Sequence, residues 1–163
     1  NNQIIIFEQD IFYYKFNRYL PNFTWYGTKA CKKKKLISPQ WLRNVKNKKF
    51  PLWRLDTFFS ENRYMNKIFI QNGGWHFSNI KNAGDLELKL KSYLHHRDYE
   101  VEELGYNKIN ELIKNNKTIY DMFGDKKSKK YGDDKRRKLE KYDLKKLPKF
   151  IQYNEVKLKE WLD

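Results

Sequence analysis

Four consecutive large apolar residues, Ile4-Ile5-Ile6-Phe7, stand near the start of the chain and limit the folds that it can adopt. A short unbroken apolar run of this kind is typical of a buried strand. Because the sequence enters this strand directly and without Met, we expect the chain to be a piece of a larger protein. Strands that pair with a missing part would leave open sheet edges, so we also expect the isolated chain to be poorly stable.

The remaining strand-type segments are short and are rich in β-branched and aromatic residues. The acidic stretch Glu8-Gln9-Asp10 interrupts the first two of them. Strands are expected at 11–16, 24–29, 67–71 and 75–78, with turns at Pro21-Asn22 and Asn72-Gly73-Gly74.

Helical patterns alternate with these strands. Ser38-Pro39 is expected to open a short helix, with Ser as N-cap, Pro at the first position and Trp41, Leu42 and Val45 on one side. Further helices are expected at 82–95 with Leu86, Leu90, Tyr93 and Leu94, at 107–115 with Ile109, Leu112 and Ile113, and from Asn154 with Val156 and Trp161. Strands and helices together predict an α/β fold, and 163 residues predict a single domain over 1–163.

The charge balance favours anionic partners. Lys and Arg number 35 against 20 Asp and Glu, giving a net charge of +15, which suits phosphates, nucleic acid or acidic lipid headgroups. Lys126 to Lys149 alone holds twelve basic and four acidic residues, and we expect a mobile loop or an exposed helix there. This segment is a candidate for peripheral membrane contact, although solvated charge is the commoner outcome.

The single cysteine, Cys31, excludes an intrachain disulfide and a thiolate metal site. A reducing compartment, the cytoplasm, fits best. The first seven residues lack the basic start of a signal peptide, and no apolar run approaches the roughly 18 residues that span a membrane.

Several residues have side chains suited to chemistry. His76 follows a strand and a Gly-Gly turn, where a side chain can face a cleft, although a structural histidine is an equally good interpretation. Glu8 and Asp10 lie two apart, hence on one side of an extended segment, and a carboxylate there could take a proton from a sugar hydroxyl. Acids of this kind more often face solvent or pair with Lys or Arg.

Other candidates are weaker. His95-His96 lies near a helix end and lacks a third nearby ligand, so a zinc site is not expected. Trp25, Trp53 and Trp75 could stack on sugar rings, yet large aromatic residues usually belong to the core.

The run Asn72-Gly73-Gly74-Trp75-His76-Phe77-Ser78, followed by Lys89 and Ser92, resembles glycosyltransferase family 17. This family includes the β-1,4-mannosyl-glycoprotein β-1,4-N-acetylglucosaminyltransferases. Glu8 to Tyr14 is similar to the Glu-Gln-Asp-Phe-Tyr-Tyr-Tyr segment of bacterial and viral members, and Trp25-Tyr26-Gly27-Thr28 matches their Trp-x-Gly-Thr. Residues 119–124, Leu147-Pro148 and Asn154 also follow the order of the family, so the resemblance covers nearly the whole chain.

The resemblance implies a partial Rossmann-like, GT-A-like domain in its C-terminal half, with mixed strands and flanking helices. It implies inverting transfer of a sugar, N-acetylglucosamine in the animal enzymes, from a uridine diphosphate donor to a glycan, with no specific nucleic acid as partner. The implied cofactor is Mn²⁺ or Mg²⁺. The implied catalytic residues are Asp10 as base, with Asp85 as a rival, and His76 as a third metal ligand or a diphosphate contact. The implied substrate-binding residues are Gly73, Gly74, Trp75, Ser78, Lys89 and Trp25.

Two departures from the family limit this expectation. The acidic Asp-x-Asp-Glu stretch that binds the metal precedes the opening strand in the family and has no counterpart here, since Asp133-Asp134 lies elsewhere in a basic stretch. Bacterial members often read His-Gln-Glu where this chain reads His95-His96-Arg97. We therefore expect the chain alone to be inactive. The alternatives are a basic module that binds nucleic acid or a membrane surface, and a relative that binds glycans without transferring sugar.

Overall fold

A computed structural model describes residues 3–47, 53, 55, 65–92, 104–119 and 136–163. These residues form an α/β structure, as predicted, and their strands make two sheets. The chain divides into two compact units, of which unit 1 comprises Asn1–Asp10 and Thr24–Gly74 and unit 2 comprises Ile11–Phe23 and Trp75–Asp163. The prediction of a single domain over 1–163 stays a prediction.

The sheet of unit 1 has three strands in the order β4-β1-β5. The central strand β1 (Gln3–Phe7) lies antiparallel to β4 (Lys29–Cys31) and parallel to β5 (Asn66–Ile70). The predicted opening strand is thus confirmed. Only alternate residues of β1 are fully buried, however, because Ile4 and Ile6 face the core whereas Ile5 is partly buried.

A short helix completes the core of unit 1. Helix α1 (Pro39–Asn44) begins as predicted, since the Ser38 hydroxyl accepts a hydrogen bond of 3.0 Å from the Trp41 backbone N–H and Pro39 occupies the first turn. The buried residues are Ile4, Ile6, Val45 and Met65, and Tyr26, Trp41, Leu42 and Phe69 pack against them. The predicted apolar side of this helix is confirmed.

The second sheet has four strands in the order β6-β2-β3-β7. These are β2 (Gln9–Phe12), β3 (Arg18–Trp25), β6 (Trp75–Phe77) and β7 (Glu140–Lys141), and the division between the units falls within β2 and β3. In unit 2, the fully buried Phe12 ring lies 5.2 Å from the Phe77 ring and 5.0 Å from the Tyr142 ring, measured between centroids. Leu147 and Ile151 close this aromatic core.

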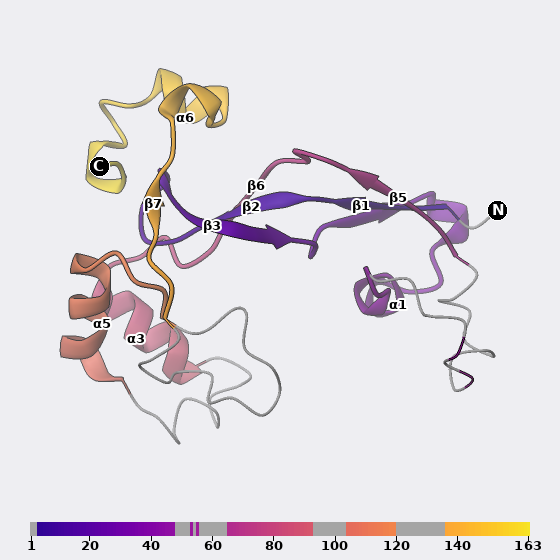
Figure 1. Ribbon diagram of the computed structural model, residues 1–163, viewed down its shortest axis with the longest axis horizontal. Helices are drawn as coiled ribbons and strands as arrows, with labels where there is room; N and C mark the ends of the chain where they lie inside the picture. The colour runs from indigo at the N-terminus through magenta and orange to yellow at the C-terminus, as the bar shows by residue number, and fades with distance from the viewer. Residues whose placement is uncertain (1–2, 48–52, 54, 56–64, 93–103, 120–135) are drawn as a thin grey trace. The chain divides into compact units, whose positions relative to one another are not determined.

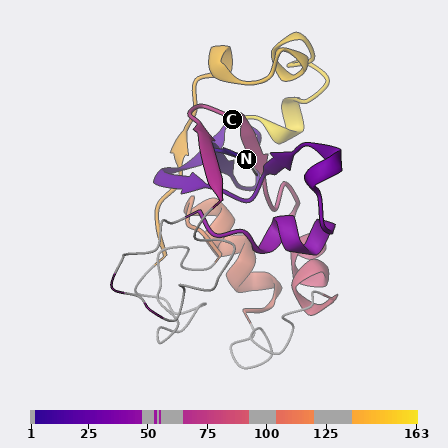
Figure 2. The ribbon, with the colours of Figure 1, turned by 90° about the vertical axis from the view of Figure 1, so that its right-hand side faces the viewer.

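Two helices of unit 2 pack side by side (Figures 1 and 2). Helix α3 (Ala83–Ser92) buries Leu86 and Leu90, and helix α5 (Gly105–Lys114) buries Ile109 and Leu112, which confirms both predicted apolar faces within the described residues. The predicted continuation of the first helix to residue 95 lies outside the described residues. The shorter helical segments are α6 (Lys149–Tyr153) and the 3₁₀ turns η1 (Lys33–Lys35), η4 (Leu144–Lys146) and η5 (Lys159–Trp161).

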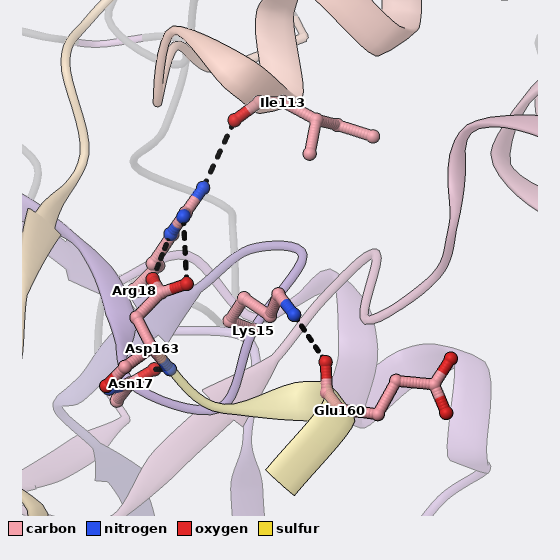
Figure 3. A network of polar contacts seen from close by, with 6 residues as sticks. All are labelled: Lys15, Asn17, Arg18, Ile113, Glu160 and Asp163. Atoms are coloured by element: carbon pink, nitrogen blue, oxygen red, sulfur yellow. Dashed lines mark hydrogen bonds and ion pairs between the residues drawn. The ribbon is translucent and has the colours of Figure 1, made fainter.

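The C-terminal segment is held to the turn that precedes β3 (Figure 3). The side chain of Asn17 is fully buried, donates to the Asp163 carbonyl over 3.1 Å and accepts from the Asp163 N–H over 3.1 Å. The Arg18 guanidinium forms a bidentate ion pair with the Asp163 carboxylate and also donates a hydrogen bond to the Ile113 carbonyl over 3.0 Å. The guanidinium therefore links the C-terminal segment to helix α5.

The predicted turn at Pro21-Asn22 is wrong, because β3 runs through both residues from Arg18 to Trp25. Strand β7 pairs only with Arg18 and Tyr19, so Pro21, which has no N–H, removes no hydrogen bond from that ladder. Asn22 adopts a φ of 57°, a left-handed conformation that Asn tolerates better than most residues. The strand predicted over 11–16 ends at Phe12.

The predicted helix from Asn154 is also wrong. Helix α6 ends at Tyr153, and the Asn154 side-chain amide donates to the Phe150 carbonyl over 2.9 Å. An Asn side chain that bonds the preceding turn in this way favours a helix end over a helix start. Val156, predicted on the buried face, is 90% exposed.

The basic stretch 126–149 is described only from residue 136 onward. The described part includes β7 and η4, and it buries Leu139 and Leu147. The predicted mobility of the whole stretch stays a prediction, as does the poor stability expected from open sheet edges.

Candidate functional site

The Gly-Gly turn after β5 is shaped by close packing within unit 1. The Gly73 N–H donates to the Glu8 carbonyl over 2.7 Å. A Cβ atom at Gly73 would lie 2.9 Å from both the Ile70 carbonyl oxygen and the Phe7 Cβ, closer than real Cβ contacts. Gly74 has a φ of +123°, which side-chain-bearing residues rarely adopt. Local packing and backbone conformation therefore require both glycines, whatever ligand the turn meets.

His76 lies directly after this turn, at the centre of the edge strand β6 in unit 2. Its side chain is partly buried. Burial lowers the pKa of the imidazole below 6.5, and the nearby positive charge of Lys89 lowers it further. Both effects favour the neutral imidazole, which can donate one hydrogen bond and accept another.

Lys89 extends from helix α3 toward the loop that follows β6. Its ammonium group donates to the Asn79 side-chain oxygen over 2.6 Å. Burial lowers the pKa of Lys89, and the charge of Lys81 adds to this effect. Asn79 is buried, has a φ of 58°, and its carbonyl accepts from the Tyr14 N–H over 3.0 Å. Asn79 thus holds Lys89 in place. The sequence offers no sign of this role beyond the presence of an Asn after a predicted strand.

The other two candidates of unit 2 flank His76. The Ser78 N–H donates to the Phe12 carbonyl over 2.9 Å, which fixes the end of β6 to β2. Trp75 is 39% exposed, and its indole N–H donates to the Lys146 carbonyl over 3.1 Å. Among the predicted site residues of unit 2, Trp75 and His76 thus lie in β6, Ser78 follows this strand directly, and Lys89 of α3 bonds the loop after it. A partly buried lysine beside an imidazole N–H is a donor set suited to an anion.

The remaining candidates belong to unit 1 or have local roles. Asp10 is partly buried in β2, and Trp25 ends β3 with its indole against Gly27, where an added Cβ would lie 2.3 Å from the ring nitrogen. Asp85 caps the start of α3 reciprocally with Asn82, since its N–H and its carboxylate both bond the Asn82 amide. This helix-capping arrangement accounts for Asp85 without a catalytic role.

The remaining residues named in the sequence analysis are not placed with His76 and Lys89. Trp53 is 78% exposed. The pair His95-His96 and the neighbouring Arg97 lie outside the described residues.

The donors that the structure describes do not suit a divalent cation. Within the described part of the chain, no three or more His, Cys, Asp or Glu side chains gather closely enough to hold a metal ion. Lys89 also places positive charge beside His76, whereas Mn²⁺ and Mg²⁺ favour several oxygen donors. These residues do not fit a cation site by themselves. The expectation that the main metal ligands precede this chain stays a prediction.

Comparison of the chain with models of known families, with curated proteins and with solved structures gave no significant match. The resemblance to glycosyltransferase family 17 thus depends on the motifs quoted above. Among the described residues, no helix combines the length and the apolar character needed to cross a bilayer.

The lowered pKa of His76 predicts a pH-dependent stability. Well above pH 6.5 the imidazole is neutral in both the folded and the unfolded chain and contributes no pH dependence. Below pH 6.5 the unfolded chain takes up the proton first, so the free energy of unfolding falls until the pH passes the folded pKa. Urea unfolding at pH 7.5 and pH 5.5 should show a smaller loss for His76→Gln than for the unchanged chain. Equal losses in the two proteins would contradict the inferred burial of the imidazole.

Proposed function

We propose that this chain is the acceptor-side part of an inverting glycosyltransferase that uses a nucleotide-diphosphate sugar, with His76 and Lys89 contacting the diphosphate. The observation that carries the proposal is the pairing of these two partly buried groups, each with a lowered pKa. Burial disfavours the protonated form of each group in the free protein, and a nearby positive charge adds to this effect, Lys89 for the imidazole of His76 and Lys81 for the ammonium group of Lys89. A diphosphate would supply the missing negative charge and favour both protonated forms.

The motif around this pair supports a sugar-nucleotide enzyme over a general anion binder. Gly73-Gly74-Trp75-His76-Phe77-Ser78 is the run that resembles glycosyltransferase family 17, and Lys89 follows in the order of that family. Trp75 is 39% exposed and offers an aromatic surface suited to a sugar ring. Because successive side chains of a strand point to opposite faces, its place beside His76 in a sugar site is supported by the resemblance alone. The proposed fold is therefore GT-A-like and the proposed sugar is N-acetylglucosamine or a close relative.

The residues have distinct proposed roles. His76 and Lys89 hold the leaving diphosphate and stabilise its developing charge. The roles of Asp10 as the base that takes the proton from the acceptor hydroxyl and of Trp25 as a sugar contact are supported by the resemblance alone, since both belong to unit 1 whereas His76 and Lys89 belong to unit 2. The Mn²⁺ or Mg²⁺ that the resemblance implies stays a prediction, because the described residues offer no set of ligands for it, and none of these roles depends on it.

Binding of uridine diphosphate tests the role of the pair directly. Titration should shift the NMR signals of the His76 imidazole and raise its pKa. Lys89→Gln should weaken binding about tenfold, as expected for loss of one charge-assisted hydrogen bond. Lys91→Gln is the matched control, because Lys91 lies on the same helix, is exposed and pairs with Glu87. Weakening by both variants alike would indicate non-specific charge attraction and contradict the proposal.

Two further observations separate sugar transfer from binding alone. An Asp-x-Asp stretch encoded immediately upstream of Asn1 would support the enzyme, and His76→Ala in the protein that contains both parts should abolish transfer. Unchanged transfer by that variant would refute the assigned role of His76. Glycan binding that persists without uridine diphosphate and without any upstream acidic pair would instead favour the non-catalytic relative.

A further inference from the structure

Three large apolar side chains of helix α6 and the turn after it are exposed. Phe150 is 69% exposed, Tyr153 80% and Val156 90%. They recur at intervals of three residues, and residues three apart on a helical segment share a side. Ile151, by contrast, is 4% exposed and belongs to the aromatic core of unit 2. One side of this segment is thus anchored in the protein, whereas another presents apolar surface outward.

Exposed lysines accompany the apolar residues. The stretch 145–157 contains Lys145, Lys146, Lys149 and Lys157 against the single acid Glu155, which gives four positive charges, one negative charge and a net charge of +3. All four lysines are exposed. An apolar patch accompanied by an excess of positive charge is complementary to a surface that is both apolar and anionic.

Hydrogen bonds hold the lysines of η4 beside α6. The Gln152 side-chain amide donates to the Lys145 carbonyl over 3.0 Å and to the Leu147 carbonyl over 2.6 Å. The Trp75 indole N–H donates to the Lys146 carbonyl. The apolar side chains and these lysines are therefore parts of one arrangement, which we call the α6 surface, made of Lys145, Lys146, Lys149, Phe150, Tyr153, Val156 and Lys157.

We propose that the α6 surface binds the anionic headgroup region of a lipid bilayer. Aromatic rings and Val156 would enter the boundary between headgroups and acyl chains, while the lysines contact lipid phosphates and carboxylates. A nucleic acid would satisfy the lysines equally well. It offers little to Val156, however, which has no ring to stack on bases and is the most exposed of the three apolar side chains. The inference is independent of sugar transfer.

Vesicle co-sedimentation of the whole chain tests the α6 surface. Vesicles of phosphatidylcholine with phosphatidylserine should retain the protein at low salt, and vesicles of phosphatidylcholine alone should retain much less. Each lysine neutralised by Gln should weaken retention about fivefold. The double variant Phe150→Ser/Val156→Ser should weaken it at least tenfold, about the effect of removing several buried CH₂ groups.

Matched controls distinguish binding through the α6 surface from non-specific adsorption of exposed apolar or charged groups. Leu88→Ser removes an equally exposed apolar side chain, 67% exposed on α3, and should leave retention unchanged. Lys108→Gln removes an exposed charge on α5 and should change little. Thermal unfolding of every variant checks that the fold persists. Three results would overturn the proposal: no retention on anionic vesicles, retention indifferent to the Phe150/Val156 change, or equal loss with Leu88→Ser. If the chain bound single-stranded DNA tightly and the Phe150/Val156 change did not affect vesicle retention, the surface would be assigned to nucleic acid.

Discussion

Replacement of Phe12 by Ala is expected to lower the free energy of unfolding by about 3–5 kcal/mol, the usual cost of removing a large buried aromatic side chain. Phe12 is fully buried, and its ring contacts Tyr19, Phe77 and Tyr142. The cavity left behind would lie at the centre of the aromatic core of unit 2. Urea unfolding followed by tryptophan fluorescence measures the change.

Phe150→Ala is the matched control for this prediction, because the same side chain is removed at a position that is 69% exposed. It should change the free energy of unfolding by less than about 0.5 kcal/mol. The Phe12 variant should also disturb the NMR signals of His76, since Phe77 lies next to His76 in β6 and packs on Phe12. Similar stability losses for the two Phe variants would mean that the aromatic core is not the main apolar core of unit 2.

Leu86→Ala is expected to cost about 2–5 kcal/mol, because Leu86 is fully buried in helix α3 and Ala would leave a cavity. Leu88, two residues further along the same helix, is 67% exposed. Its replacement by Ala should be close to neutral, since Ala also has the higher helix propensity. The pair of variants thus measures burial on one helix with helix propensity held constant.

The Leu86 variant carries a second expectation for the proposed site. Helix α3 also positions Lys89, whose ammonium group bonds Asn79. Loss of packing beneath the helix should weaken uridine diphosphate binding by Leu86→Ala but not by Leu88→Ala. If Leu86→Ala were as stable as Leu88→Ala, the assignment of the buried face of α3 would be wrong.

The sequence predicted those elements that are determined by neighbouring residues. Ser38-Pro39 specifies the start of α1 through one side-chain hydrogen bond, and the spacing of Leu86 and Leu90 specifies the buried face of α3. Pro21-Asn22 was misleading because a proline can remain in a strand where the neighbouring ladder has already ended. The extent of that ladder depends on β7, more than a hundred positions away, and the residues around Pro21 do not reveal it.

The sequence motif supplied the candidate residues, but it did not predict the contacts that hold their side chains. His76 and Lys89 were identified from a motif, and the structure relates them through the effect of one charge on the other. Asn79, which bonds Lys89, directly follows the motif but was not among the predicted site residues, because its importance depends on its backbone conformation and on burial. The division into two units was also not predictable, since neither unit is a continuous stretch of chain.

The contacts of Asn17 and Arg18 with Asp163 have a consequence for biosynthesis. These partners are separated by 146 and 145 positions, so a ribosome must release nearly the whole sequence before they can meet. Closing so long a loop is slow compared with forming a local helix. During translation unit 2 would therefore stay incomplete until Asp163 has left the ribosome, and chaperone demand should be highest before that point.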